Sequence, residues 1–325
     1  MTDAVPVFDL QEWKSADAGR RAEWSKELDA ALSLTGMLLI SNHGVPNELT
    51  DRMRREGHEF LQLPDEQKRQ YEVARPYDNG WRGLGALQAS AVDGVGMAPD
   101  LHEAYHIGPE HRTGNEKFDH TYYPANKWPR EMPHFQKTAT EYTDHMTRLS
   151  LELEEVFAEV LGLAGDYFVS RSQRATWTQN VNWYPSLDTV GAVKEGQMRV
   201  GPHSDFGVLS LLDRQPGVGG LQVWNDRDDW FTPPYVPGTI AVILGDLMNL
   251  WTDGRWRALR HRVLPPPPSA PNEELVSLVF FFEADPDARI EPLAAPVGGG
   301  AGMEPVIAGE NILEKVGVTL TPTFS

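Results

Sequence analysis

The sequence contains no cysteine, and this absence narrows the chemistry that the protein can perform. A chain without thiols forms no disulfide bond, has no thiolate nucleophile, and cannot build a zinc–thiolate or iron–sulfur site. Any metal must therefore be bound by imidazole and carboxylate groups, which suit iron, manganese, zinc and copper. The same absence is typical of the reducing cytoplasm, where we expect the protein to be located.

Basic residues and long apolar runs are also scarce. The 325 residues include 29 Lys and Arg against 47 Asp and Glu, which gives a formal net charge of −18. A surface this acidic repels phosphate backbones and anionic lipids, so we expect no nucleic-acid partner and no membrane partner. No apolar run approaches the roughly 20 residues of a membrane span, and the N-terminal pattern predicts no signal peptide. The sequence leaves the oligomeric state open.

The hydrophobic pattern changes from helical to strand-like along the chain. Over residues 135–163, apolar residues recur at steps of three and four, which predicts a long amphipathic helix. From about Thr176, short apolar runs alternate with Gly, Pro, Asp and Asn, which indicates closely spaced strands. Residues 76–99 are rich in Gly and Ala and poor in periodicity, so they are predicted to form a loop. The strand candidates are residues 208–212, 220–224, 239–244 and 275–282.

These patterns predict an α+β fold built around a jelly roll, which is a double-stranded β-helix of two sheets. We expect residues 1–170 to form a mainly helical N-terminal region and residues 171–325 to form the jelly-roll core. The flanking helices then come mostly from the N-terminal half. Because these helices are expected to pack around the β core, we expect residues 1–325 to form a single unit.

A histidine and an aspartate stand two positions apart in the segment 201–207. Side chains alternate along a strand, so His203 and Asp205 would point to the same side and could reach one metal ion together. His261, in a later strand-like stretch, is the candidate third ligand. Two imidazoles and one carboxylate leave three octahedral positions open, which is the arrangement of non-haem iron(II) oxygenases. The alternative is a hydrogen-bonded core histidine beside an aspartate that forms the turn before Gly207.

The motifs around this pair resemble, almost from end to end, those of the isopenicillin N synthase-like branch of the iron(II)/2-oxoglutarate-dependent oxygenases. Residues 5–10 and 36–45 are similar to the first two strands of that family. The resemblance implies that His203, Asp205 and His261 bind Fe²⁺. It also implies that 2-oxoglutarate and dioxygen are consumed while a small molecule is hydroxylated, desaturated or cyclised. The matching motifs of the second half are residues 201–207, 209–212, 219–223, 237–246, 251–256 and 261–263.

One position departs from the family pattern. Relatives carry Arg-x-Ser on the strand after the distal histidine, and that arginine pairs with the far carboxylate of 2-oxoglutarate. Here Leu275 takes the place of the arginine, while Ser277 is retained. Leucine donates no hydrogen bond, and a buried carboxylate beside it would be costly. Either another cation binds the cosubstrate, or 2-oxoglutarate is not used.

Strand parity nominates two replacement cations for the cosubstrate. Arg257 precedes His261 by four residues, and Arg199 precedes His203 by four, so each would point inward on a regular strand. Arg257 also matches a position that is often lysine in relatives. Tyr184 corresponds to a tyrosine that often lies near the cosubstrate in relatives. The structural alternatives are rim charges for the two arginines and a packed core residue for the tyrosine.

Two other functions stay open at this point. The expected function is a 2-oxoglutarate-dependent oxygenase, and the missing arginine keeps open the alternative of an oxidase that uses dioxygen without 2-oxoglutarate, as isopenicillin N synthase does. A non-catalytic binding protein on the same fold is the other alternative, and the intact set of three ligands argues against it. Iron content after anaerobic reconstitution discriminates between an enzyme and such a binding protein. The substrate itself is not indicated by the sequence, and the candidate pocket residues are Trp81, Arg82, Tyr105 and Trp183.

Overall fold

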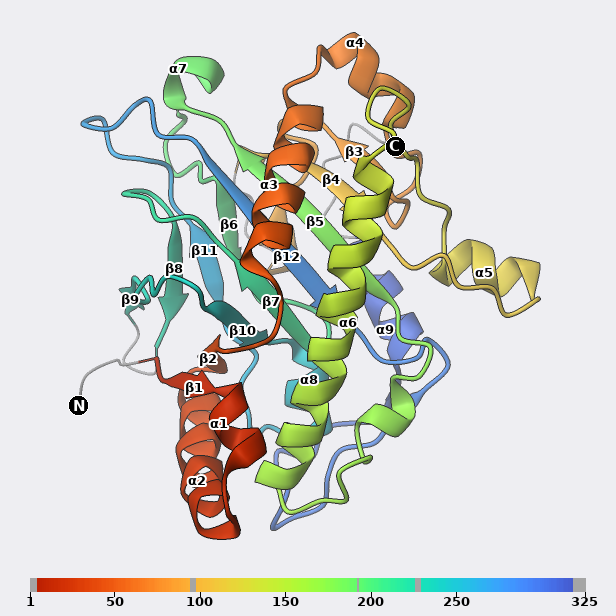
Figure 1. The fold of residues 1–325 in the computed structure, drawn as a ribbon, viewed down its shortest axis with the longest axis vertical. Helices are drawn as coiled ribbons and strands as arrows, with labels where there is room; N and C mark the ends of the chain where they lie inside the picture. The colour runs from red at the N-terminus through yellow and green to blue at the C-terminus, as the bar shows by residue number, and fades with distance from the viewer. Residues whose placement is uncertain (1–4, 94–97, 192, 226–228, 318–325) are drawn as a thin grey trace.

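The computed structural model, which describes residues 5–93, 98–191, 193–225 and 229–317, is built on two β-sheets (Figure 1). The main sheet contains, in spatial order, β1 (Val7–Asp9), β2 (Met37–Ser41), β10 (Ile240–Leu244), β7 (Leu209–Asp213), β12 (Leu275–Phe282), β5 (Trp177–Tyr184), β4 (Glu103–Ile107) and β3 (Gly80–Arg82). The smaller sheet contains β6 (Val200–His203), β11 (His261–Val263), β8 (Leu221–Trp224) and β9 (Trp230–Phe231), and β13 (Arg289–Ile290) pairs separately with β14 (Val306–Ile307).

Helices flank the main sheet. They are α1 (Leu10–Ser15), α2 (Ala18–Leu34), α3 (Asn47–Leu61), α4 (Asp65–Lys68), α5 (Glu116–Tyr122), α6 (Phe135–Val160), α7 (Leu187–Val190), α8 (Asp246–Trp251) and α9 (Ala308–Val316). In Figure 1, α3 and α6 lie across the sheet, and both contact β12. A Cβ atom at Gly57 of α3 would lie 2.7 Å from the Val181 side chain, so this glycine permits the close approach of helix and strand.

The alternation of side chains along β5 separates the two environments of the main sheet. Val181 is fully buried and packs against α3, on the helix-covered face. Its neighbours Asn180 and Asn182, together with Tyr184, line a cavity on the opposite face. Strand β10 is buried at every position, which explains why it appears in the sequence as a continuous apolar run. The main sheet therefore has an apolar side toward the helices and a partly polar side toward the cavity.

The structure confirms the α+β class and the two-sheet core, and it corrects the sequence prediction in three places. The predicted loop 76–99 contains β3 and a 3-10 helix over Ala89–Asp93. Strand β4 also lies within the first 170 residues, so this region supplies four strands to the main sheet. The C-terminal helix α9 was not predicted. Within the described ranges, no helix combines the length and the apolar character that a membrane crossing requires.

Candidate active site

Three predicted metal ligands come together where β6 ends and β11 begins. The two strands are antiparallel neighbours, and His203 lies directly opposite His261 in their register. The prediction from side-chain alternation assumed that Asp205 lies on the same strand as His203. Asp205 instead follows the strand, because β6 ends at His203. Its Oδ1 nonetheless lies 3.5 Å from Nε2 of His203 and 3.7 Å from Nε2 of His261. The three potential ligand atoms lie within 4.8 Å of one another, which is a spacing that one metal ion can bridge.

Hydrogen bonds orient all three ligands toward a common point. Nδ1 of His203 donates to the carbonyl of Gly201 (2.9 Å), and Nδ1 of His261 donates to the carbonyl of Leu259 (3.1 Å). Each imidazole therefore presents the lone pair of Nε2 to the centre. The hydroxyl of Ser210 donates to Oδ2 of Asp205 (2.6 Å), which leaves Oδ1 for the metal. Two imidazole nitrogens and one carboxylate oxygen on one side fit iron(II) and leave the other side open for cosubstrate and dioxygen.

The charges at this centre favour metal binding at neutral pH. Burial opposes the negative charge of Asp205, but His261, His203 and Ser210 outweigh it and lower the pKa of Asp205 to about 2. Burial and the neighbouring His203 lower the pKa of His261 to about 4, so its imidazole is neutral and can act as a ligand. For His203, Asp205 overcomes the effect of burial and raises the pKa. A metal cation would take the place of the proton that this carboxylate attracts.

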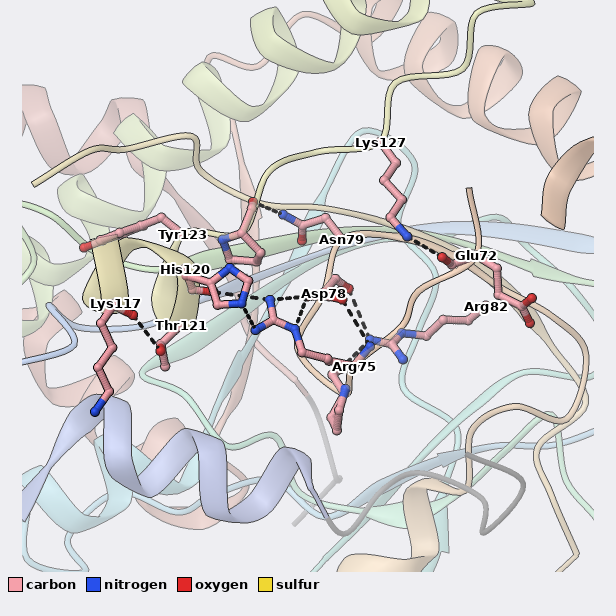
Figure 2. Close-up of polar contacts among 12 residues, drawn as sticks. Glu72, Arg75, Asp78, Asn79, Arg82, Lys117, His120, Thr121, Tyr123 and Lys127 are labelled. Atoms are coloured by element: carbon pink, nitrogen blue, oxygen red, sulfur yellow. Dashed lines mark hydrogen bonds and ion pairs between the residues drawn. The ribbon is translucent and has the colours of Figure 1, made fainter. Parts of the chain in front are cut away.

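A cavity of ≈ 300 Å³ connects the three ligands with the surface. It lies between the two sheets, and its outer part is lined by residues of α5 and α9, among them Tyr122 and Leu313. Figure 2 shows the polar contacts along part of the cavity wall, where Arg75, Asp78 and Arg82 are joined by hydrogen bonds. The mixture of apolar and polar lining is typical of a small-molecule site.

The structure places the four cosubstrate candidates differently. Tyr184 lines the cavity, and its hydroxyl lies 3.2 Å from Oγ of Ser277. Arg199 is almost fully buried, with its guanidinium over the Tyr184 ring at 5.8 Å, but it is not among the described residues that line the cavity. Arg257 is exposed and also lies outside that lining. Neither arginine lies on the regular strand that the prediction from side-chain alternation assumed, because β6 begins at Val200 and β11 begins at His261.

Of the candidate pocket residues, one lines the cavity. Arg82 does so from β3, whereas Trp81 and Tyr105 are buried in the hydrophobic core. Trp183 packs against that core from its edge, and its Nε1 donates to Glu274. The sequence therefore indicated Arg82 only as one of four possibilities.

Sequence reasoning missed Glu283, which follows β12 directly and lines the cavity. Its Oε2 is shielded from solvent and has no hydrogen-bond partner. Burial, aided by the nearby Asp205 carboxylate, raises the pKa of Glu283 to about 8. A side chain at Gly207 would collide with this carboxyl group, so the glycine in the metal motif makes room for it. In the sequence, Glu283 could have been recognised as an acidic residue at the end of a long apolar run.

Comparisons with known proteins agree with this geometry. A family model described as non-haem dioxygenase in morphine synthesis N-terminal matches residues 5–131, and one described as 2OG-Fe(II) oxygenase superfamily matches residues 178–284. The chain is 60% identical to validamycin A dioxygenase of Streptomyces hygroscopicus subsp. limoneus, over 97% of this chain and 86% of that protein. It is 28% identical to homoarginine-6-hydroxylase 2-ODD-C23 of Glycine max, over 96% of each chain.

A solved structure supports the fold. The crystal structure of a full-length Neurospora crassa protein in complex with alpha-KG matches with a TM-score of 0.82 and 22% identity, over 96% of this chain and 95% of that chain. The family resemblance is thereby confirmed, and 2-oxoglutarate use is favoured over the oxidase alternative despite Leu275. The chain belongs to the 2OG-Fe(II) oxygenase superfamily, and it is a non-haem iron(II)- and 2-oxoglutarate-dependent dioxygenase that oxidises a small molecule.

Proposed function

We propose that this enzyme oxygenates validamycin A or a close structural analogue. One observation carries the proposal, which is the 60% identity to validamycin A dioxygenase over almost the whole chain. The plant homoarginine hydroxylase is only 28% identical over a similar length. A difference of this size favours the substrate of the bacterial relative over that of the plant relative.

The proposed roles of the metal ligands follow from their contacts. His203, Asp205 and His261 hold iron(II), with Gly201 and Leu259 carbonyls fixing the imidazole rings. Iron(II) held by these residues would supply, together with 2-oxoglutarate, the activation of dioxygen that the oxidation of the substrate requires. Ser210 holds one oxygen of Asp205, so that only the other oxygen faces the metal. The cavity walls keep bulk water away from the reacting atoms.

The far carboxylate of 2-oxoglutarate is proposed to bind at Tyr184 and Ser277. Both residues are buried, and their hydroxyl groups are 3.2 Å apart, so together they can donate to one carboxylate. Leu275 pairs with Tyr184 across β12 and β5, which locates the position where relatives carry arginine. The positive charge is then proposed to come from Arg199, which lies over the Tyr184 ring.

Arg199 is favoured over Arg257 because of its surroundings. Its Nη1 donates to Oε1 of Glu273 (2.8 Å) and its Nη2 to the Glu273 carbonyl (2.7 Å), only two residues before Leu275. Its Nε is shielded from solvent and has no partner. A buried cation with a spare donor beside Tyr184 is suited to a carboxylate ligand. Arg257, in contrast, is exposed.

Three broader expectations are part of the same proposal. Strands from both parts of the chain share the main sheet, which supports a single folding unit of residues 1–325. The net charge of −18 supports a protein that acts on a small molecule without nucleic-acid or membrane partners. The absence of cysteine and the need for ferrous iron support a cytoplasmic location.

The proposed function is tested by incubating the iron(II) enzyme with 2-oxoglutarate, dioxygen and validamycin A. We expect succinate to form in proportion to a product that is one oxygen atom heavier than validamycin A. Mass spectrometry measures both, and Asp205→Ala serves as the matched inactive control. Succinate formation that does not depend on validamycin A would contradict the proposed substrate.

A further inference from the structure

A polar patch on the cavity wall is not explained by the metal centre. Arg82 is the one Lys or Arg side chain among the described residues that line the cavity, and it is only 4% exposed. His106 and Asn180 line the same cavity from the next two strands. His106 of β4 lies directly opposite Asn180 of β5, and Arg82 of β3 lies opposite Ala104, two residues before His106. Arg82 and His106 are therefore diagonal neighbours on one face of the sheet.

The guanidinium of Arg82 is held in one orientation. Its Nε donates to Nδ1 of His106 (3.1 Å), and its Nη2 donates to the carbonyl of Pro76. Its Nη2 also donates to the carbonyl of Asp78 (Figure 2). Burial lowers the pKa of Arg82 to about 10, so the group stays charged at neutral pH. Its Nη1 is shielded from solvent and has no partner. A buried donor of this kind costs free energy until an acceptor reaches it.

The protonation of His106 follows from the same contact. Because Nδ1 accepts the hydrogen bond from Arg82, the proton of the neutral ring is on Nε2. Burial, with Arg82 and His102 nearby, holds the pKa of His106 well below its ordinary value, so the ring is neutral. Nε2 is shielded and has no partner, and neither has Oδ1 of Asn180. The patch therefore offers two fixed donors and one acceptor.

We propose that Arg82, His106 and Asn180 form a substrate subsite for a polyhydroxylated compound. A hydroxyl group both accepts and donates, so neighbouring hydroxyls can satisfy Arg82 Nη1, His106 Nε2 and Asn180 Oδ1 together. An anionic group fits less well, because the Asp78 carboxylate acts on Arg82 from nearby and Asn180 presents a carbonyl oxygen, which would repel a second acceptor. The subsite rests on the proposed function in that it recognises the molecule which the iron centre oxidises.

The test measures binding without turnover. Calorimetry follows validamycin A binding to the Mn(II)·2-oxoglutarate complex of wild type, Arg82→Met and His106→Phe. We expect the dissociation constant to rise at least about tenfold in each variant, because each loses a donor to the ligand. Affinity for 2-oxoglutarate should stay at the wild-type value, which also shows that the variants are folded.

Arg75→Met is the matched control. Arg75 belongs to the same loop and binds Asp78, but it does not line the cavity. If Arg82 acted only by supporting the loop, Arg75→Met would weaken the binding of validamycin A as much as Arg82→Met does. This result would overturn the subsite. We expect a change below about threefold for the control.

The remaining outcomes separate the subsite from the proposed function. If the wild type and both cavity variants bind validamycin A equally well, the subsite is overturned and the proposed function stands. A wild type that binds neither validamycin A nor any of a panel of mono- and disaccharides overturns both. Tighter binding of glucuronate than of glucose, lost in Arg82→Met, would overturn the hydroxyl assignment in favour of an anionic group.

Discussion

Replacing Arg199 by methionine should weaken both the fold and 2-oxoglutarate binding. The side chains of Arg199 and Glu273 are 1% and 11% exposed, and their N–O distance is 2.8 Å. Arg199→Met leaves the Glu273 carboxylate buried with only the backbone N–H groups of Val218 and Gly219. Removing one partner of a buried ion pair costs about 3–5 kcal/mol. Because two N–H donors remain, we expect the lower end, about 3 kcal/mol, or on the order of 100-fold in the folded-to-unfolded ratio.

The assay combines urea denaturation with an anaerobic titration. Denaturation of Arg199→Met, Glu273→Gln and the double variant gives the coupling free energy of the pair, and we expect the double variant to lose less than the sum. The titration follows the visible charge-transfer band of the iron(II) protein as 2-oxoglutarate is added. The dissociation constant should rise at least about tenfold in Arg199→Met, because a charge-assisted hydrogen bond is lost. Arg257→Ala is the exposed control, and it should change neither quantity.

Two results would refute this reasoning. Additive losses of stability in the double variant would mean that Arg199 and Glu273 are not coupled. A destabilised Arg199→Met protein that binds 2-oxoglutarate with wild-type affinity would confine Arg199 to a structural role. The far carboxylate of 2-oxoglutarate would then have to be bound by Tyr184 and Ser277 alone or by another cation.

Three further predictions concern other parts of the chain. His203→Ala and Asp205→Ala should each lose iron binding and succinate formation while circular dichroism stays unchanged, and stoichiometric tight iron binding by either would contradict the ligand assignment. Leu275→Arg should lower the melting temperature, because it adds a second cation near the Arg199–Glu273 ion pair. Adding 2-oxoglutarate with Mn(II) should restore the melting temperature by binding the folded state. An unchanged melting temperature would contradict the placement of Leu275. Burial raises the pKa of Glu154 from 4.5 to about 8, so wild type should lose stability as pH rises through that window, by up to about 5 kcal/mol. Glu154→Gln should flatten this dependence in denaturation experiments at several pH values, and parallel curves would show that Glu154 titrates normally.

The amino-acid sequence was enough to predict the family, and it indicated His203, Asp205 and His261 as the candidate metal ligands that the fold brings together. The ligand chemistry depends on residue types in a short motif, and His203, Asp205 and His261 keep both the types and the order. The sequence also located the central strands to within one or two residues, since β7, β8, β10 and β12 are apolar runs bounded by turn residues. Short apolar runs of this kind are identified by composition and flanking turn residues, and β10, which is buried at every position, is the clearest case.

Which polar residues face the cavity depends on how the strands pair in three dimensions. Parity along the chain predicts direction only inside a regular strand, and both Asp205 and Arg257 lie outside one. Arg82 and His106 come from β3 and β4, which are short and lack a strong apolar pattern. The sequence indicated Arg82 only as one of four possible pocket residues, and it did not indicate His106. Arg82 and His106 become buried donors because β3 and β4 pair with strands that are distant along the chain. A donor lacks a partner only where the surrounding fold excludes water from it.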